Sequence, residues 1–230
     1  MTDLENVKQS LKALEYCPIT SIYTYFSSAV NLFRFLPKAE KKECAQSFYQ
    51  WARDNAEENP VKFGFAELLL GLNDHLNDEH ESALSSFIKA RKHFEEKNYP
   101  EGVGLCAILT GSIYRTFGNF DLALKTLWEG YNLVKLTNHN WIFLSGCTNS
   151  IANINLEMHN YDEAQKMFAA TYEESEKMDD YYFMIYALHG LGKVNMQQNK
   201  YTEAKEFFEK ALQLGEKNKS PLGKIGRAHV

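Results

Sequence analysis

One pattern of aromatic, small and large apolar residues returns four times along the chain. In each copy an aromatic residue or His is followed three positions later by Ala, then by a large apolar residue four positions on and a small residue three positions further. The Ala positions are Ala83, Ala123, Ala164 and Ala204, so successive copies are 40, 41 and 40 residues apart. A period of this length is typical of stacked helical units, none of which buries its apolar face alone.

The other positions of the pattern predict how the helices of a unit pack. Two helices approach closely only where side chains are small, and large side chains fill the remaining space. Small residues on the preceding helices are Gly71, Gly111, Ala152 and Gly192, and the large apolar residues are Phe87, Leu127, Phe168 and Phe208.

Apolar residues recur at helical spacing nearly everywhere, and the five Pro fall between these stretches, so we expect helices and no strands. We predict N-terminal helices at 4–16, 19–36 and 39–55, then four antiparallel pairs at 61–76 with 79–96, 102–117 with 120–136, 141–158 with 161–178, and 182–198 with 201–216. Asp78 with Glu81, and Asn160 with Glu163, fit capping pairs at helix starts. Gly118 supplies a permissive turn residue and Asn119 an N-cap.

The four copies resemble the tetratricopeptide repeat family over about residues 61–217. The matching residues in the last copy are Leu188, Leu191-Gly192, Tyr201, Ala204, Phe208 and Ala211. The resemblance implies a right-handed superhelical solenoid of antiparallel helix pairs that binds proteins, and its long period is similar to variants common in bacterial signalling proteins. This chain departs from the family pattern in its period, since the usual repeat has about 34 residues, and in lacking the family's Trp.

The repeats divide the chain into segments. We expect an N-terminal helical cap at 1–60, in which Ala45, Tyr49 and Ala52 indicate a degenerate repeat. Four pairs follow at about 61–98, 99–138, 139–179 and 180–217, with a connector at 218–224.

The last six residues, 225–230, resemble a translated short-read sequencing adapter. The codons ATC-GGA-AGA-GCA-CAC-GTC encode these residues, and the next codon of that oligonucleotide is a stop. We interpret 225–230 as an artefact, and we expect the natural protein to continue beyond residue 224.

Composition limits the classes of partner. The net charge of −5 offers no electrostatic footprint for nucleic acid. The N-terminus shows no signal peptide, and no apolar run is long enough to span a membrane. The four Cys are far apart in sequence, which favours reduced core residues in a cytoplasmic protein.

No catalytic or nucleotide-binding motif is present, so we predict a protein that is not an enzyme and that needs no cofactor or metal. The densest polar cluster, residues 74–81, contains possible metal ligands. It spans a turn between helices, and we interpret it as a solvated turn rather than a metal site.

The inner faces of the first helices are the candidate binding groove. Aligning the copies on their Ala positions places ten candidates there: Leu68, Leu72, Ile108, Ser112, Arg115, Asn149, Asn153, Tyr186, His189 and Lys193. Neighbouring positions are Phe65, His75, Leu105, Leu156 and Met196. Asn149 and Asn153 lie one turn apart and fit the backbone of an extended peptide. Arg115 and Lys193 fit an acidic side chain or a C-terminal carboxylate.

Two functions follow from these observations. The first is an interaction module that binds a peptide or protein segment in the groove. The alternative is the sensor half of a bacterial signalling protein whose cyclase, kinase, phosphatase or transcription-regulator domain is missing. We also expect self-association through the exposed C-terminal repeat.

Overall fold

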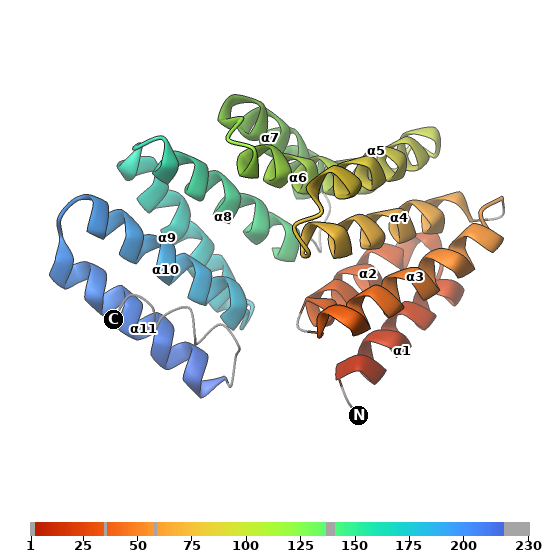
Figure 1. The fold of residues 1–230 in the computed structure, drawn as a ribbon, viewed down its shortest axis with the longest axis horizontal. Helices are drawn as coiled ribbons and strands as arrows, with labels where there is room; N and C mark the ends of the chain where they lie inside the picture. Colours follow the sequence, from red (N-terminus) through yellow and green to blue (C-terminus); the bar gives the residue numbers. More distant parts are fainter. Residues whose placement is uncertain (1–2, 35, 58, 137–140, 219–230) are drawn as a thin grey trace. The chain divides into compact units, whose positions relative to one another are not determined.

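The computed structural model describes residues 3–34, 36–57, 59–136 and 141–218, and all regular structure within them is α-helical. The helices are α1 (Asp3–Tyr16), α2 (Ile19–Phe33), α3 (Lys38–Asp54), α4 (Pro60–His75), α5 (His80–Glu96), α6 (Pro100–Thr116), α7 (Phe120–Lys135), α8 (Trp141–Glu157), α9 (Tyr161–Lys177), α10 (Tyr181–Gln197) and α11 (Tyr201–Lys217) (Figure 1). The predicted all-α fold of consecutive helix pairs is confirmed. The adapter-like residues 225–230 and nearly all of the predicted connector lie outside the described residues.

The chain forms two compact units, Met1–Ile142 and Phe143–Val230. The division falls just inside the third predicted repeat, at 139–179. The segment boundaries derived from the sequence remain predictions.

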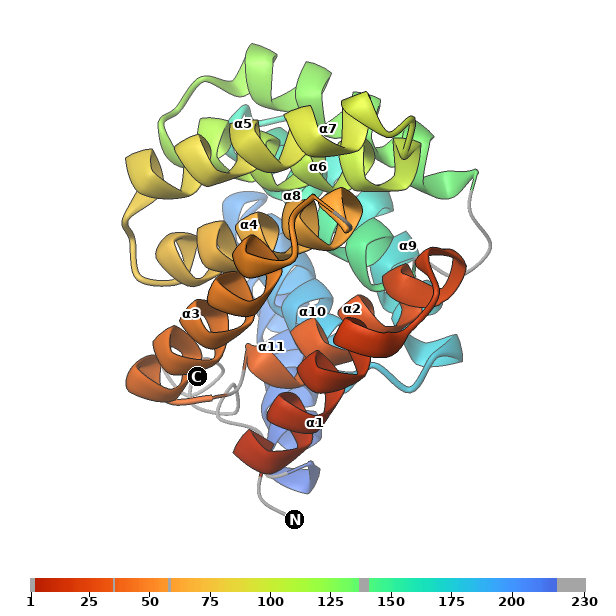
Figure 2. The ribbon, with the colours of Figure 1, turned by 90° about the vertical axis from the view of Figure 1, so that its right-hand side faces the viewer.

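In the first unit, glycines allow the paired helices to approach each other. A Cβ atom at Gly71 of α4 would lie 2.6 Å from Phe87 Cε1 of α5, and one at Gly111 of α6 would lie 2.7 Å from Leu127 Cγ of α7. Consecutive helices α4 to α7 accordingly lie side by side in both ribbon views (Figures 1 and 2). The predicted role of the small residues is therefore confirmed in these two pairs.

The second unit uses the same packing. A Cβ atom at Gly192 of α10 would lie 2.5 Å from Phe208 Cε1 of α11. Ala152, Ala164 and Phe168 form a buried cluster with residues of α10, so the large residue of one pair also packs against the next pair. This shared packing explains why the pairs must stack.

Six of the turns from α4 onward share one backbone design. Asp78, Asn98, His159, Asp179 and Asn199 all have positive φ, as does Gly118. In each turn the next residue donates its backbone N–H to a carbonyl five residues earlier, for example Glu79 N to Asp74 O at 2.9 Å. This is the helix C-terminal motif that ends in a left-handed residue.

This design corrects two of the predicted caps. Asp78 is the left-handed turn residue rather than an N-cap, and Asn160 occupies the N-cap position without a side-chain capping bond. The backbone motif thus closes the turns where a side-chain cap was expected. Asn119 does cap α7 as predicted, since its side chain accepts a hydrogen bond from Leu122 N.

The N-terminal helices cover part of α4. The Phe26 ring of α2 lies 4.7 Å from the Phe65 ring of α4, and Phe65 is fully buried. Lys62 Nζ of α4 donates a hydrogen bond to Glu15 O of α1 at 2.6 Å. The face of α4 expected to be open is therefore packed against protein.

Candidate functional site

Three of the ten predicted groove residues are core residues. Leu68 is fully buried, and Leu72 and Ile108 expose 9% and 3% of their surface. The sequence alignment treated the inner face of the first pair as open, but helices α2 and α6 both pack against α4. The prediction that these three side chains line an open groove is therefore wrong, because they belong to the core.

The two polar candidates on α6 are half-buried. Ser112 Oγ donates a hydrogen bond to Ile108 O at 3.1 Å, within its own helix. Arg115 lies close enough to His75 for its charge to lower the pKa of that ring. The α6 candidates are therefore already engaged with the first unit.

In the second unit, α8 and α10 form an open pocket of about 410 Å³. Four residues of the predicted inner face line it together: Asn153, Leu156, Lys193 and Met196. It is completed by Glu157, His159 and Gln197, which were not among the candidates. Glu157 and Gln197 lie one helical turn beyond Asn153 and Lys193, so the same spacing pointed to them. His159 enters from the α8–α9 turn, which a helical pattern does not address.

The pocket combines a cation, amide groups and an apolar wall. Within the described residues, no hydrogen bond or ion pair engages Lys193, so its ammonium group is available to a ligand. Asn153 Nδ2 donates to Asn149 O at 2.7 Å, which holds the amide in place and leaves Oδ1 as an acceptor. Leu156 and Met196 supply apolar surface beside these polar groups.

The remaining candidates of this unit lie elsewhere. The His189 ring is 5.4 Å from the Phe208 ring, so it faces the partner helix α11. The Tyr186 ring is 4.8 Å from the Tyr182 ring on the same helix. Asn149 Oδ1 is buried within the unit. The structure therefore brings Asn153 and Lys193 together, but not the whole predicted set.

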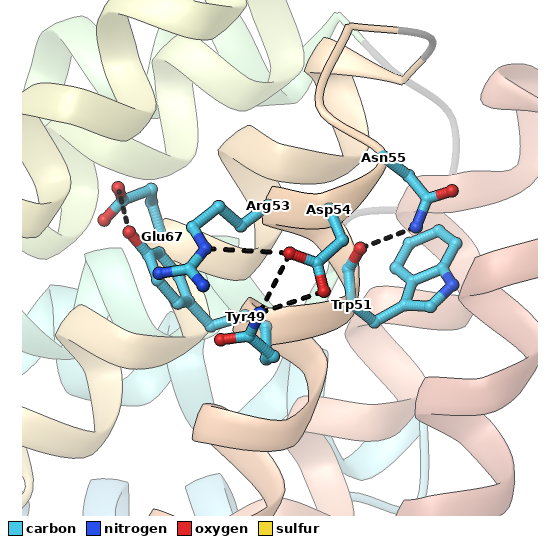
Figure 3. Close-up of polar contacts among 7 residues, drawn as sticks. Tyr49, Trp51, Arg53, Asp54, Asn55 and Glu67 are labelled. Carbon is cyan, nitrogen blue, oxygen red and sulfur yellow. Dashed lines mark hydrogen bonds and ion pairs between the residues drawn. The ribbon is translucent and has the colours of Figure 1, made fainter.

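A separate polar cluster in the first unit joins α3 and α4 (Figure 3). Tyr49 Oη donates a hydrogen bond to Glu67 Oε1 at 3.4 Å, and Glu67 exposes only 3% of its surface. Burial raises the pKa of Glu67, while the charge of Lys89 and the Tyr49 hydrogen bond act in the opposite direction. Because the Tyr49–Glu67 contact joins two packed helices and Glu67 is buried, this cluster bears on stability.

Other possible chemistry is limited. All four Cys are free and buried, and burial raises the pKa of Cys147 to about 12, which keeps that thiol protonated and unreactive. Within the described ranges, no group of three or more His, Cys, Asp or Glu is arranged to hold a metal ion. None of the described helices combines the length and apolarity required to cross a bilayer.

Stacked antiparallel helix pairs with small residues at their contacts define a helical repeat protein. A tetratricopeptide repeat model matches residues 144–217. This match covers about a third of the chain and spans the helix pairs α8–α9 and α10–α11 from residue 144 onward. A search of curated proteins finds no match.

Several solved structures share this fold at low sequence identity. BtubC (BKLC) from P. vanneervenii is 15% identical with a TM-score of 0.66, and the alignment covers 94% of this chain and 91% of that one. The Rap protein complexed with competence and sporulation factor is 9% identical with a TM-score of 0.66, over 97% of this chain and 67% of that one. A signal transduction ATPase with a tetratricopeptide repeat sensor from Pyrococcus horikoshii is 14% identical with a TM-score of 0.60, over 94% of this chain and 37% of that one.

Proposed function

We propose that the chain is a non-enzymatic interaction module that binds a peptide or protein segment on the inner face of its first helices. The observation that carries the proposal is the pocket between α8 and α10, where Lys193 and Asn153 lie beside Leu156 and Met196. Repeat arrays of this kind typically serve as scaffolds for other proteins.

The pocket chemistry suits a segment with a carboxylate next to an apolar side chain. An ammonium group attracts a carboxylate, and a charge-assisted hydrogen bond is stronger than a neutral one. Asn153 Oδ1 accepts a backbone N–H of the same segment, and Leu156 with Met196 cover its apolar side chain. Glu157 also lines the pocket.

The comparisons support protein binding only by analogy. The Rap protein shares the fold and is complexed with competence and sporulation factor. That likeness supports a polypeptide ligand for this chain. It does not support any particular sequence.

The test is binding of an array of short peptides that carry acidic and apolar residues, each made with a free and an amidated C-terminus. We expect Lys193→Gln to weaken binding of the selected peptide at least about tenfold, since hydrogen bonds to charged groups are worth about 1.5–3 kcal/mol. Asn153→Ala should weaken it less. Lys166→Gln on α9 is the matched control, because that lysine lies outside the pocket and pairs with Glu163.

Two results would contradict the proposed site. One is equal peptide binding by the wild type and Lys193→Gln. The other is a loss of binding in Lys193→Gln that is accompanied by a melting temperature clearly below that of the wild type, since this would indicate unfolding. Amidation distinguishes a C-terminal carboxylate from an acidic side chain as the group that is bound.

A second candidate is the sensor part of a larger signalling protein in the cytoplasm. It is favoured by the likeness to the ATPase with a tetratricopeptide repeat sensor, in which the matched region makes up 37% of the chain. The genomic reading frame beyond codon 224 tests this candidate. A cyclase, kinase, phosphatase or DNA-binding pattern there would favour the sensor, and further repeats followed by a stop would favour the scaffold.

A further inference from the structure

Two histidines at the end of the first helix pair face each other through the same ring atom. His75 is the last residue of α4 and His80 the first residue of α5. Their Nδ1 atoms are 3.3 Å apart, and their ring centroids are 5.2 Å apart. We propose that His75 and His80 form a two-histidine site for Zn²⁺ that joins the end of α4 to the start of α5. This inference is independent of the proposed peptide pocket.

The nitrogen separation is the first argument. Two nitrogens bound at about 2.0–2.1 Å to one tetrahedral zinc ion lie about 3.3–3.4 Å apart. The two Nδ1 atoms therefore already have the spacing that a shared metal requires. A five-residue separation across a closed turn, with the backbone bond from Glu79 N to Asp74 O, holds both helix ends in place.

The surroundings of the two rings are the second argument. The Phe117 ring packs 5.9 Å from the His80 ring and limits its movement. Asp78 Oδ1 lies 4.0 Å from His80 Nε2, which is too far for a hydrogen bond but places a negative charge near the second nitrogen of this ring.

The hydrogen bond between the two rings is compatible with ligation. Without metal, one Nδ1–H donates to the other Nδ1. A histidine binds a metal through an unprotonated ring nitrogen. Zinc binding therefore moves the donor's proton to Nε2 of the same ring, while the acceptor ring already carries its proton on Nε2.

The site is a weak and exchangeable one. It supplies two protein ligands, and water fills the other zinc positions. The positive charge of Arg115 nearby also opposes a divalent cation. In this proposal the turn at residues 74–81, expected from the sequence to be simply solvated, also binds a metal ion.

Calorimetric titration of the full chain with Zn²⁺ tests the site. We expect one equivalent to bind, and His75→Gln and His80→Gln each to weaken binding at least about tenfold, because even outer partners of metal sites are worth 10–100-fold. His159→Gln is the control, since this exposed ring lies in the second unit and contacts Tyr161 Oη at 2.7 Å. Asp78→Asn should weaken binding by a smaller factor.

Nitrogen NMR of the imidazole rings gives a second measurement that needs no variant. We expect both rings to be Nε2–H tautomers at saturating zinc, with the Nδ1 resonances of His75 and His80 shifted by the metal, whereas without zinc one of the two rings carries Nδ1–H. Unchanged ring shifts at saturating zinc would overturn the proposal. So would a double variant, His75→Gln with His80→Gln, that binds zinc as tightly as the wild type.

Discussion

Glu67 places a carboxyl group on a buried face of α4, where its neighbours only partly replace water. It receives one hydrogen bond, from Tyr49 at 3.4 Å, and Lys89 contributes an attractive charge. Burial outweighs both, because the pKa of Glu67 is raised above its ordinary value of 4.5. The ionised form is therefore less favourable in the folded chain than in the unfolded one.

The raised pKa of Glu67 predicts a pH-dependent stability. The folded state holds the proton more tightly, so the contribution of this group is fully present below pH 4.5 and is lost as the pH rises through the folded pKa. Glu67→Gln should raise the unfolding free energy at neutral pH and flatten this part of the pH profile. Urea unfolding at a series of pH values measures it, with the exposed Glu81→Gln as control. A variant that is less stable at neutral pH would contradict the prediction.

At the scale of the element, the helix contacts should not tolerate a methyl group at the closest glycines. A Cβ atom at Gly192 would lie 2.5 Å from Phe208 Cε1, whereas one at Gly146 would lie 3.3 Å from Phe183 Cζ. Ala gains about 1 kcal/mol in helix propensity over Gly, while overpacking costs about 1–3 kcal/mol. We expect Gly192→Ala to lower the melting temperature and Gly146→Ala to leave it unchanged or raise it. Equal effects at the two sites would count against close packing at Gly192.

At the turn residues with positive φ, we expect a change to glycine to increase stability. Asp179 has φ 52° between α9 and α10, and Gly118 has φ 74° between α6 and α7. A non-glycine residue in this region is strained by about 1–2 kcal/mol, less for Asp and Asn. Asp179→Gly should therefore stabilise the chain by up to about 1 kcal/mol. Gly118→Ala should destabilise it by about 1 kcal/mol. Denaturant unfolding measures both, and a destabilised Asp179→Gly would contradict the argument.

The helices were largely predictable from the sequence, whereas their ends were less so. Periodicity and Pro placed α1 at 4–16 and the structure has Asp3–Tyr16, because one apolar face defines each helix. The predicted N-cap at Asp78 was wrong, because Asp is suited both to N-cap positions and to left-handed turn positions. Only the backbone conformation separates these two roles.

At the scale of the whole molecule, the repeat pattern predicted which residues share a face but not which faces stay open. Asn153 and Lys193 line one pocket because they occupy equivalent inner-face positions on α8 and α10. The prediction that Leu68 lines an open groove was wrong. The N-terminal helices carry only a weak repeat pattern, which did not reveal that α2 packs on α4. The division into two units could not be predicted either, because the repeat pattern continues unchanged across the boundary between Ile142 and Phe143.

The two units predict that a core defect stays local. Phe168 is fully buried and packs with Ala152, Ala164 and Val194 inside the second unit. Phe168→Ala should cost about 3–5 kcal/mol. Because each repeat contacts only its neighbours, hydrogen exchange followed by mass spectrometry should show lost protection in α9 to α11 and retained protection in α4 and α5. The exposed substitution Lys166→Gln, two residues earlier on α9, controls for a change in surface charge. Equal loss of protection in both units would mean that the chain unfolds as one cooperative body. The prediction that a core defect stays within the second unit would then be wrong.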